Sequence, residues 1–384
     1  MRDDCIAMIK RLVAHPTVSR DSNMNLIEDV QEYLSGFGIT SRLVPNEDGA
    51  KANLYATVGP AVEGGIVLSG HTDVVPVDGQ PWDSYPFTVE ERNGRLYGRG
   101  TCDMKSFYAI ALALVPRMLQ ARLARPIHFA LSYDEEVGFI GAPSMIERLA
   151  KELPAPRAVI VGEPTSMRVV NAHKGMTGVE TIVTGHEAHS SQTHRGVSAV
   201  MTAARLITFL DDLAREKAAG PHSQAAFEPP YTSIHVGTVQ GGTATNIISR
   251  ECRFKWDVRC IPEDNPQEVL DRFYDFCDSL LPDMRSIAPQ ANIETIVHFA
   301  APALRPETQD GRAEQLAKGL AGQNATEVVS YGTEGGQFQD AGFSAVLCGP
   351  GSIDQAHQPN EFIELTQVDA CIGFMQRLIE YQSA

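Results

Sequence analysis

Two histidine-containing segments stand almost at opposite ends of this chain and carry its strongest constraint on folding. Ser-Gly-His71-Thr-Asp73 lies near the front, and Gln-Ala-His357-Gln-Pro-Asn-Glu lies near the end. Acidic residues in motif-like segments lie between them: Asp103, Glu135, Glu136 and Glu163. Imidazoles and carboxylates are the ligands of two-metal hydrolytic sites. A fold that uses these residues together must bring the front and the end of the chain to one place.

Apolar runs precede most of these residues. The runs predict buried strands with polar side chains at their carboxyl ends, at residues 65–68, 127–133, 158–161 and 345–348. Apolar residues at helical spacing predict helices over 104–119 and 142–149. Alternating strands and helices are typical of an α/β domain, whose ligands gather at the carboxyl edge of its sheet.

The middle of the chain follows a different order. Strands are expected over 178–183, 232–239, 251–259 and 292–299, with helices over 197–217 and 266–281. This βαββαβ order indicates a small α+β sandwich, with a polar stretch over 218–230. We therefore expect a catalytic metal-binding domain at 1–177 and 301–384, and an inserted dimerisation or lid domain at 178–300.

Composition narrows the functional classes. The 384 residues suffice for two domains, and the chain contains no apolar run of about 20 residues that would suit a membrane span. The formal net charge of -16 argues against nucleic acid and anionic membranes as partners. Seven scattered cysteines and a start without a signal-like segment favour reduced thiols and a cytoplasmic location.

Each motif taken alone has a plainer interpretation. The carboxylate of Asp73 could orient His71 through its second ring nitrogen, or His71 could be an ordinary strand-end histidine near a surface acid. Asp103 could bridge two metals or cap the helix after it. Solvated turns would account for the remaining positions, Glu135, Glu136, Glu163 and His357. Convergence favours the metal site, because two histidines and three carboxylates would hold two zinc-like ions and leave room for water.

Together the motifs carry a family resemblance over essentially the whole chain. The chain resembles the M20 metallopeptidases, and within them the acetylornithine deacetylase branch. The matching segments are Ser-Gly-His71-Thr-Asp73, Gly-Thr-Cys-Asp103-Met-Lys, Asp134-Glu135-Glu136, Gly-Glu163-Pro-Thr, Ala-His173-Lys-Gly and Gly-Pro-Gly-Ser-Ile-Asp-Gln-Ala-His357-Gln-Pro-Asn-Glu.

The resemblance implies two zinc ions per subunit, with cobalt as a substitute. It implies His71 and Glu163 on one ion, Glu136 and His357 on the other, and a bridging Asp103. Glu135 would be the general acid/base, and Asp73 would be a further catalytic residue beside it. In the inserted domain, His189 would reach the active site of a partner subunit in a homodimer, and Asn246 and Arg259 would contact substrate. Thr193 stands where the family often has proline, and Cys102 and Ser106 replace smaller residues.

These expectations point to removal of the acetyl group from N2-acetyl-L-ornithine, a step of arginine biosynthesis. Arg259 and the Gly332–Thr333 backbone would hold the substrate carboxylate, and Glu334 would select a cationic side chain unless it is only a solvated loop acid. The alternatives are another M20 deacylase (a succinyl-diaminopimelate desuccinylase, an aminoacylase or a dipeptidase) and a non-catalytic metal-binding protein of the same fold.

Overall fold

The computed structural model describes residues 1–221, 226–307 and 311–384. The chain forms two compact units, one built from Met1–Ala172, Leu304–Val328 and Thr333–Ala384 and the other from His173–Ala303 and Val329–Gly332. We call them the main unit and the insert. Part of the predicted polar stretch, residues 222–225, lies outside the described residues. The catalytic and dimerisation roles expected for the two domains stay predictions.

The main unit contains an eight-stranded mixed sheet in the order β1-β2-β6-β3-β7-β14-β8-β13. Its strands are β1 (Ser41–Pro45), β2 (Ala52–Val58), β3 (Ile66–His71), β6 (Ile127–Ser132), β7 (Ala158–Pro164), β8 (Val170–His173), β13 (Glu327–Val329) and β14 (Ala345–Gly349). Every residue of β3, β6, β7 and β14 is buried. Parallel sheets covered on both faces require such continuous apolar strands, so the expected α/β fold class is confirmed.

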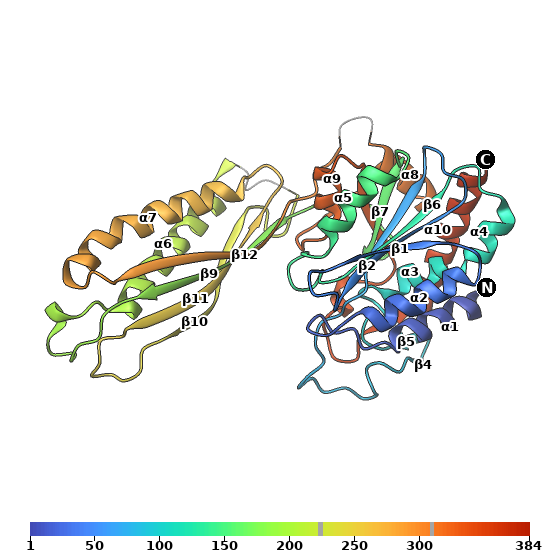
Figure 1. Ribbon diagram of the computed structural model, residues 1–384. Helices are drawn as coiled ribbons and strands as arrows, with labels where there is room; N and C mark the ends of the chain where they lie inside the picture. Colours follow the sequence, from blue (N-terminus) through green and yellow to red (C-terminus); the bar gives the residue numbers. More distant parts are fainter. Residues whose placement is uncertain (222–225, 308–310) are drawn as a thin grey trace. The chain divides into compact units, whose positions relative to one another are not determined.

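Helices of the main unit cover both faces of this sheet (Figure 1). They are α1 (Arg2–Val13), α2 (Met24–Ser35), α3 (Lys105–Ala113), α4 (Val115–Ala121), α5 (Ala142–Glu152), α8 (Arg312–Ala321), α9 (Gly335–Asp340) and α10 (Leu365–Ser383). Helices α1, α3 and α10 pack on one another within one apolar core, whereas α5 and α9 pack together elsewhere. A small antiparallel sheet adds β4 (Glu90–Arg92), β5 (Arg95–Tyr97) and β15 (Phe362–Glu364).

The single helix predicted over 104–119 is wrong. The structure has two helices, α3 and α4, which meet at Leu114. Pro116 lies in the first turn of α4, where its missing N–H costs nothing, whereas inside a continuous helix it would remove a hydrogen bond. The apolar spacing continues through the break, so periodicity alone did not reveal it.

The insert is a four-stranded antiparallel sheet in the order β10-β11-β9-β12. Its elements are β9 (Gly175–Thr184), a short 3-10 helix η1 (Thr193–Arg195), α6 (Ala199–Ala219), β10 (Ser233–Gly241), β11 (Glu251–Cys260), α7 (Pro266–Ile287) and β12 (Asn292–Ala301). The two long helices and the sheet share one apolar core that includes Phe254, Trp256 and Phe273. This is the βαββαβ order expected from the sequence.

Candidate metal centre

The four strands that precede the predicted ligands are consecutive neighbours in the main sheet. β6, β3, β7 and β14 lie in that order, and each adjacent pair is parallel. His71 is the last residue of β3 and Glu163 is close to the end of β7. Glu135 follows the end of β6, and His357 follows β14 after a loop and the 3-10 helix η3 (Ile353–Gln355). The parallel register therefore delivers these side chains to one edge of the sheet.

Donor atoms converge at this edge. Two sets of three residues each place one ligand atom per residue within 4.8 Å of one another: His71 with Glu135 and Glu163, and His71 with Asp103 and Glu136. The Nε2 atom of His71 lies 3.0 Å from Oδ1 of Asp103 and 4.0 Å from Oε1 of Glu163. One imidazole thus links the two acidic sets.

The second predicted histidine reaches the same place from the end of the chain. His357 Nε2 lies 3.2 Å from Oδ2 of Asp103 and 3.0 Å from Oε2 of Glu136. Asp103 therefore stands between two imidazoles, with one carboxylate oxygen toward each. His357 is about half exposed, so the site is open to solvent on this side.

Burial makes the acidic cluster electrostatically costly. Burial and the charges of neighbouring carboxylates raise the pKa of Glu135 and of Glu163 well above the usual range, against the charge of His71. Burial and the charge of Asp103 raise the pKa of Glu136 to about 7. Such groups are stable as anions only beside compensating cations.

The two histidines and Asp103 favour their charged forms in this cluster. Burial alone would disfavour a charged His71, yet the charge of Glu135 and a hydrogen bond to Asp103 raise its pKa well above the usual range. Hydrogen bonds to Asp103 and Glu136 raise the pKa of His357 to about 10. Although burial opposes it, hydrogen bonds from His357 and His71 lower the pKa of Asp103.

The arrangement fits two divalent cations. Oε1 of Glu163 is buried without a hydrogen-bond partner among the described residues, and a buried carboxylate oxygen needs either a hydrogen bond or a cation. Histidine nitrogens and carboxylate oxygens are zinc ligands. The cluster therefore offers a donor set for metal ions where a protein without them would hold several close, poorly compensated acids.

Asp73 orients the site through different atoms from those expected. Its main-chain oxygen lies 2.9 Å from His71 Nδ1, whereas its carboxylate Oδ1 is 3.7 Å away. A carbonyl acceptor fixes the proton on Nδ1 and leaves Nε2 for the metal side. The carboxylate instead accepts the main-chain N–H groups of Glu135 and Glu136 at 3.1 and 3.2 Å, and the Ser19 hydroxyl at 2.7 Å. Asp73 thus holds the turn that carries both glutamates.

Asp103 is not a helix cap, which corrects the plainer interpretation of that residue. Met104 occupies the cap position of α3, and no side chain makes a capping hydrogen bond there. The N–H of Asp103 instead donates to Oε1 of Glu361 at 3.1 Å. Glu361 closes the His357-Gln-Pro-Asn-Glu segment, but nothing in the sequence indicated that it contacts the segment carrying Asp103. Cys102 is buried, as expected.

In the insert, His189 and Asn246 lie on adjacent segments. His189 pairs with Ile247 in an antiparallel bridge, and the N–H of Ser190 donates to the main-chain oxygen of Asn246 at 3.0 Å. The N–H of Ser191 donates to His189 Nδ1 at 3.2 Å. With Nδ1 as acceptor, the neutral ring carries its proton on Nε2 and can donate from there. Both residues are exposed.

Arg259 lies far from that pair within the insert. It sits opposite Met176 at one end of the β9–β11 ladder, while Glu251 sits opposite Thr184 at the other. Eight residues of strand separate the two positions, about 26 Å at the usual rise of ~3.3 Å per residue. The segment that holds His189 continues beyond Thr184. Arg259 and His189 of one copy are therefore too far apart to contact the same small substrate.

The predicted substrate loop is more buried than expected. Thr333 is fully buried, and its hydroxyl accepts the N–H of Gly335 at 3.0 Å. Glu334 is 1% exposed, so the solvated loop acid considered from the sequence is wrong. Burial raises the pKa of Glu334 to about 7, while the nearby Ser132 hydroxyl lowers it. Gly332 is half-buried and belongs to the insert.

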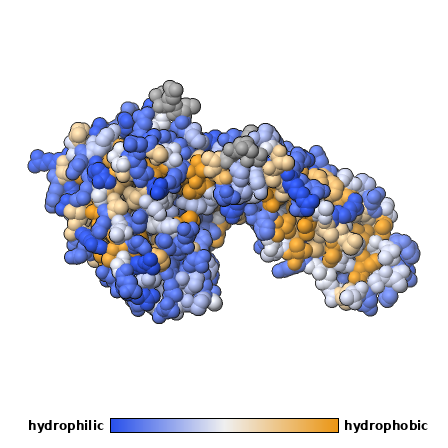
Figure 2. All heavy atoms as spheres, turned by 180° about the vertical axis from the view of Figure 1, so that it is seen from behind, coloured by the Kyte–Doolittle hydropathy of each residue, from blue (hydrophilic) through white to orange (hydrophobic). Residues whose placement is uncertain are grey.

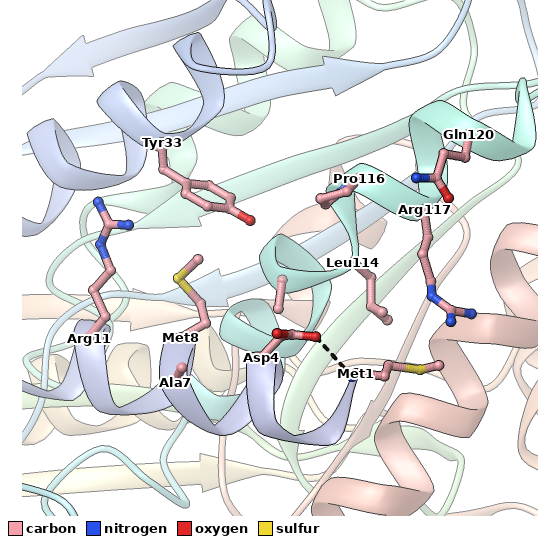
Figure 3. A pocket seen from close by; sticks show the side chains of 11 residues that line it. Met1, Asp4, Ala7, Met8, Arg11, Tyr33, Leu114, Pro116, Arg117 and Gln120 are labelled. Carbon is pink, nitrogen blue, oxygen red and sulfur yellow. Dashed lines mark ion pairs between the residues drawn. The ribbon is translucent and has the colours of Figure 1, made fainter.

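A cavity of about 580 Å³ elsewhere in the main unit contains none of the predicted site residues (Figure 3). It is lined by residues of α1, α2, α3 and α4, and by Leu114 between the last two helices. The amino group of Met1 pairs with Asp4 across its floor at 2.8 Å. Its wall lies at the end of α3 remote from Asp103, so this cavity is separate from the metal centre.

The comparisons agree with the geometry. The sequence pattern of peptidase family M20/M25/M40 matches residues 67–381. The chain belongs to this family. It is 34% identical to acetylornithine deacetylase of Proteus mirabilis, over 98% of this chain and 96% of the relative. It is 34% identical to the Myxococcus xanthus protein of the same name, over the same shares, and 32% identical to that of Pasteurella multocida, over 97% of each chain.

Solved structures share the fold at low sequence identity. A metallo-carboxypeptidase of the M20 family from Sulfolobus solfataricus superimposes with a TM-score of 0.76 at 18% identity, over 99% of both chains. A tripeptidase from Staphylococcus aureus gives 0.74 at 20% identity, over 100% of this chain and 99% of the other. The expected enzyme class is confirmed: this M20 protein is a metallohydrolase. Among the described residues, no helix is long and apolar enough to cross a membrane.

Proposed function

We propose that this M20 enzyme removes the acetyl group from N2-acetyl-L-ornithine and releases ornithine and acetate, a step in arginine biosynthesis. The observation that carries the proposal is full-length similarity: relatives named acetylornithine deacetylase from several bacteria align over 97–98% of this chain at 32–34% identity. The cluster of two imidazoles and buried carboxylates also supports it, because such residues could hold the metal ions that amide hydrolysis would use.

The proposed ligand assignment is the one that the family resemblance implies, and several distances support it. His71 and Glu163 would hold one zinc ion, Glu136 and His357 would hold the other, and Asp103 would be shared between them. Its two oxygens face different imidazoles at 3.0 and 3.2 Å, which supports this role. Cobalt is the expected substitute. Two such ions, when bound, would supply a Lewis acid for the amide carbonyl and would lower the pKa of water at the site.

Glu135 is the proposed proton shuttle. It is buried at the cluster, and burial raises the pKa of its carboxyl group well above the usual range. A carboxylate held beside the reacting water could take its proton and return it to the departing amine. Asp73 supports this step by holding the Glu135 main chain.

Substrate contacts are proposed at the residues that the sequence pointed to. The guanidinium of Arg259, which lies 3.4 Å from Asp257 Oδ1, suits the substrate carboxylate, assisted by the Gly332–Thr333 backbone. In its ionised form Glu334 would favour a cationic substrate, although burial raises its pKa to about 7. Because Glu334 is buried, this selection would act through the field of the carboxylate instead of through an open loop.

We further propose a homodimer in which His189 and Asn246 complete the partner's site. The distance along the β9–β11 ladder supports this division, because Arg259 and His189 of one copy cannot both contact one small substrate. A His189 that donates from Nε2 suits the stabilisation of a developing oxyanion. Hydrophobic side chains gather on the visible face of the insert (Figure 2), and the exposed hydrophobic residues of this unit include Val200, Met201, Val239 and Ile247. Such surfaces often mark association sites.

A substrate panel tests the proposal. Purified enzyme should release amine from N2-acetylornithine with a higher kcat/KM than from N-acetylglutamate, N-succinyl-diaminopimelate or a neutral dipeptide. Glu334→Gln should reduce the preference for the cationic substrate over the acidic one. Efficient release from the succinyl substrate or the dipeptide, with little from acetylornithine, would identify a different M20 deacylase. The cytoplasmic location expected from the sequence stays a prediction.

A further inference from the structure

One buried carboxylate binds three main-chain N–H groups of the turn that carries Asp103. Oε1 of Glu361 accepts hydrogen bonds from Gly100 at 3.0 Å, Cys102 at 2.8 Å and Asp103 at 3.1 Å. Gly100 has a φ of +85°, a backbone conformation that glycine adopts readily and that lets N–H groups of one turn point inward together. Concave groups of successive N–H donors are anion sites. We call these three donors the amide nest.

The other oxygen of Glu361 is also engaged. Oε2 accepts from Arg99 Nη1 at 2.7 Å, and both residues are 1% exposed. Arg99 Nη2 donates to Gln80 Oε1 at 2.7 Å. A carboxylate in this position is an acceptor at both oxygens and meets only donors, which a carboxamide cannot reproduce. The site is therefore built for a charged carboxylate.

The nest fixes the residue at the centre of the metal site. The Asp103 carboxylate lies between His71 and His357, and its direction depends on a main chain that Glu361 holds at three points. Glu361 follows His357 by four residues. One short segment thus supplies a ligand and also positions the acid that the ligand faces. On the opposite side, Asp73 does the same for the turn of Glu135 and Glu136.

We propose that Glu361 is a positioning residue that sets the metal affinity of the centre by holding the amide nest in place. The inference rests on the proposed ligand set and not on the identity of the substrate. Outer-shell partners of metal ligands typically change affinity by ~10–100-fold when they are replaced. Glu361 contacts the main chain of Asp103 and not its carboxylate. Replacing Glu361 should therefore lower metal affinity by loosening the turn that carries Asp103.

The decisive variant is Glu361→Gln. In either orientation of the carboxamide, its NH2 group faces a donor, either Arg99 or the nest. The affinity for Zn²⁺, measured by competition with a chromophoric chelator in the absence of substrate, should fall by about 10–100-fold. Hydrogen exchange of the metal-free protein should also be faster in the peptide that spans the nest, with little change in β2 and β6.

Two further variants separate positioning from a general loss of stability. Arg99→Gln breaks the same ion pair but leaves the carboxylate on the nest, so it should lower the melting temperature while the chelator-measured affinity changes by much less than in Glu361→Gln. The double variant Arg99→Met/Glu361→Gln removes the unpaired buried charge and should still bind zinc weakly. Glu364→Gln, three residues further along the chain in a partly exposed pair with Arg95, is the matched control and should behave as the wild type.

The outcomes decide whether Glu361 positions the metal site or only stabilises the fold. Zinc affinity within about twofold of wild type in folded Glu361→Gln protein, or in the folded double variant, would overturn the proposal, as would an equal loss in Arg99→Gln. Weak zinc binding with faster exchange confined to the nest would support it. A wild-type enzyme that binds zinc normally but does not act on acetylornithine would refute the proposed substrate and leave this result standing.

Discussion

The metal edge of the main unit and the His189 region of the insert present functional side chains in opposite ways. At the metal edge His71, Asp103 and Glu163 are almost completely buried, and their donor atoms already converge. In the insert, His189 and Asn246 are exposed. Their segments are ordered by main-chain pairing, but within the insert no described acid or base converges on them as at the metal edge.

The difference shows that the main unit assembles its cluster of acids and histidines by itself. Parallel neighbours β6, β3, β7 and β14 bring the proposed ligands to one edge, and Asp73 and Glu361 hold the turns beside them. Preorganised groups of this kind bind ions and support chemistry without large rearrangement. The insert presents a hydrogen-bond donor instead, which is useful only when another surface supplies the reacting group. The predictions below test that division.

Metal removal should have the largest effect. Dialysis against a strong chelator should abolish turnover, and Zn²⁺ or Co²⁺ should restore it with two ions bound per chain, because both ions polarise or activate the reactants. Elemental analysis and activity assays provide the measurement. Ion binding should also raise the unfolding temperature of the main unit more than that of the insert. Full activity in metal-free protein would show that the residues at the metal edge do not act through bound ions.

Glu135→Gln should have the second largest effect on turnover. Loss of the proton shuttle should lower kcat by roughly 10²–10⁴-fold, as is typical of general acid–base groups, while both ions stay bound. Elemental analysis alongside steady-state kinetics checks both parts. Glu147→Gln, on the exposed face of α5, is a control that should keep wild-type kinetics. A kcat within a few-fold of wild type would mean that the base lies elsewhere.

Subunit mixing tests the role of the insert directly. His189→Ala and Glu135→Gln homodimers should each be nearly inactive, whereas a mixed dimer has one site with both residues intact if His189 acts on the partner. Random pairing of equal amounts should recover up to about a quarter of wild-type activity, for independent sites. Subunit exchange is verified by native mass spectrometry with one labelled variant. No recovery after exchange would place His189 in its own subunit's site or outside the chemistry.

Low pH should reduce the folding stability of both units, because each contains a buried histidine with a lowered pKa. Burial lowers the pKa of His128 in the main unit and of His173 in the insert to about 4. The unfolded chain binds a proton at these positions below about pH 6.5, whereas the folded chain does not until about pH 4. The contribution of each histidine is therefore complete above about pH 6.5 and is lost as the pH falls toward 4, by up to about 3 kcal/mol each.

Urea unfolding of metal-free protein at several pH values measures this effect. His128→Gln and His173→Gln should each show a smaller loss of stability between pH 7 and pH 4 than the wild type. His298→Gln, at a partly exposed position beside Glu180, is the control. Equal pH slopes in wild type and the His128 variant would show that folding does not lower the pKa of this histidine.

Much of the architecture could be predicted from local patterns. Continuous apolar runs predicted the four buried strands, and the βαββαβ order of the insert followed from alternating periodicities. The same method failed between 104 and 119, where the apolar spacing is helical but Pro116 starts a new helix. Periodicity reports which residues face a core, and it is insensitive to a break that keeps the same face buried.

The sequence by itself determined which residues are available: the two histidines, the acids after apolar runs, and the order of the strands along the chain. Tertiary structure alone decided that β6, β3, β7 and β14 are neighbours, that the main-chain oxygen of Asp73 and not its carboxylate meets His71, and that Glu334 is buried. It also decided that Glu361 holds the turn of Asp103, across 258 positions of sequence. Strand order in a sheet and the direction of a main-chain N–H depend on long-range packing, and no local spacing of residue types encodes them.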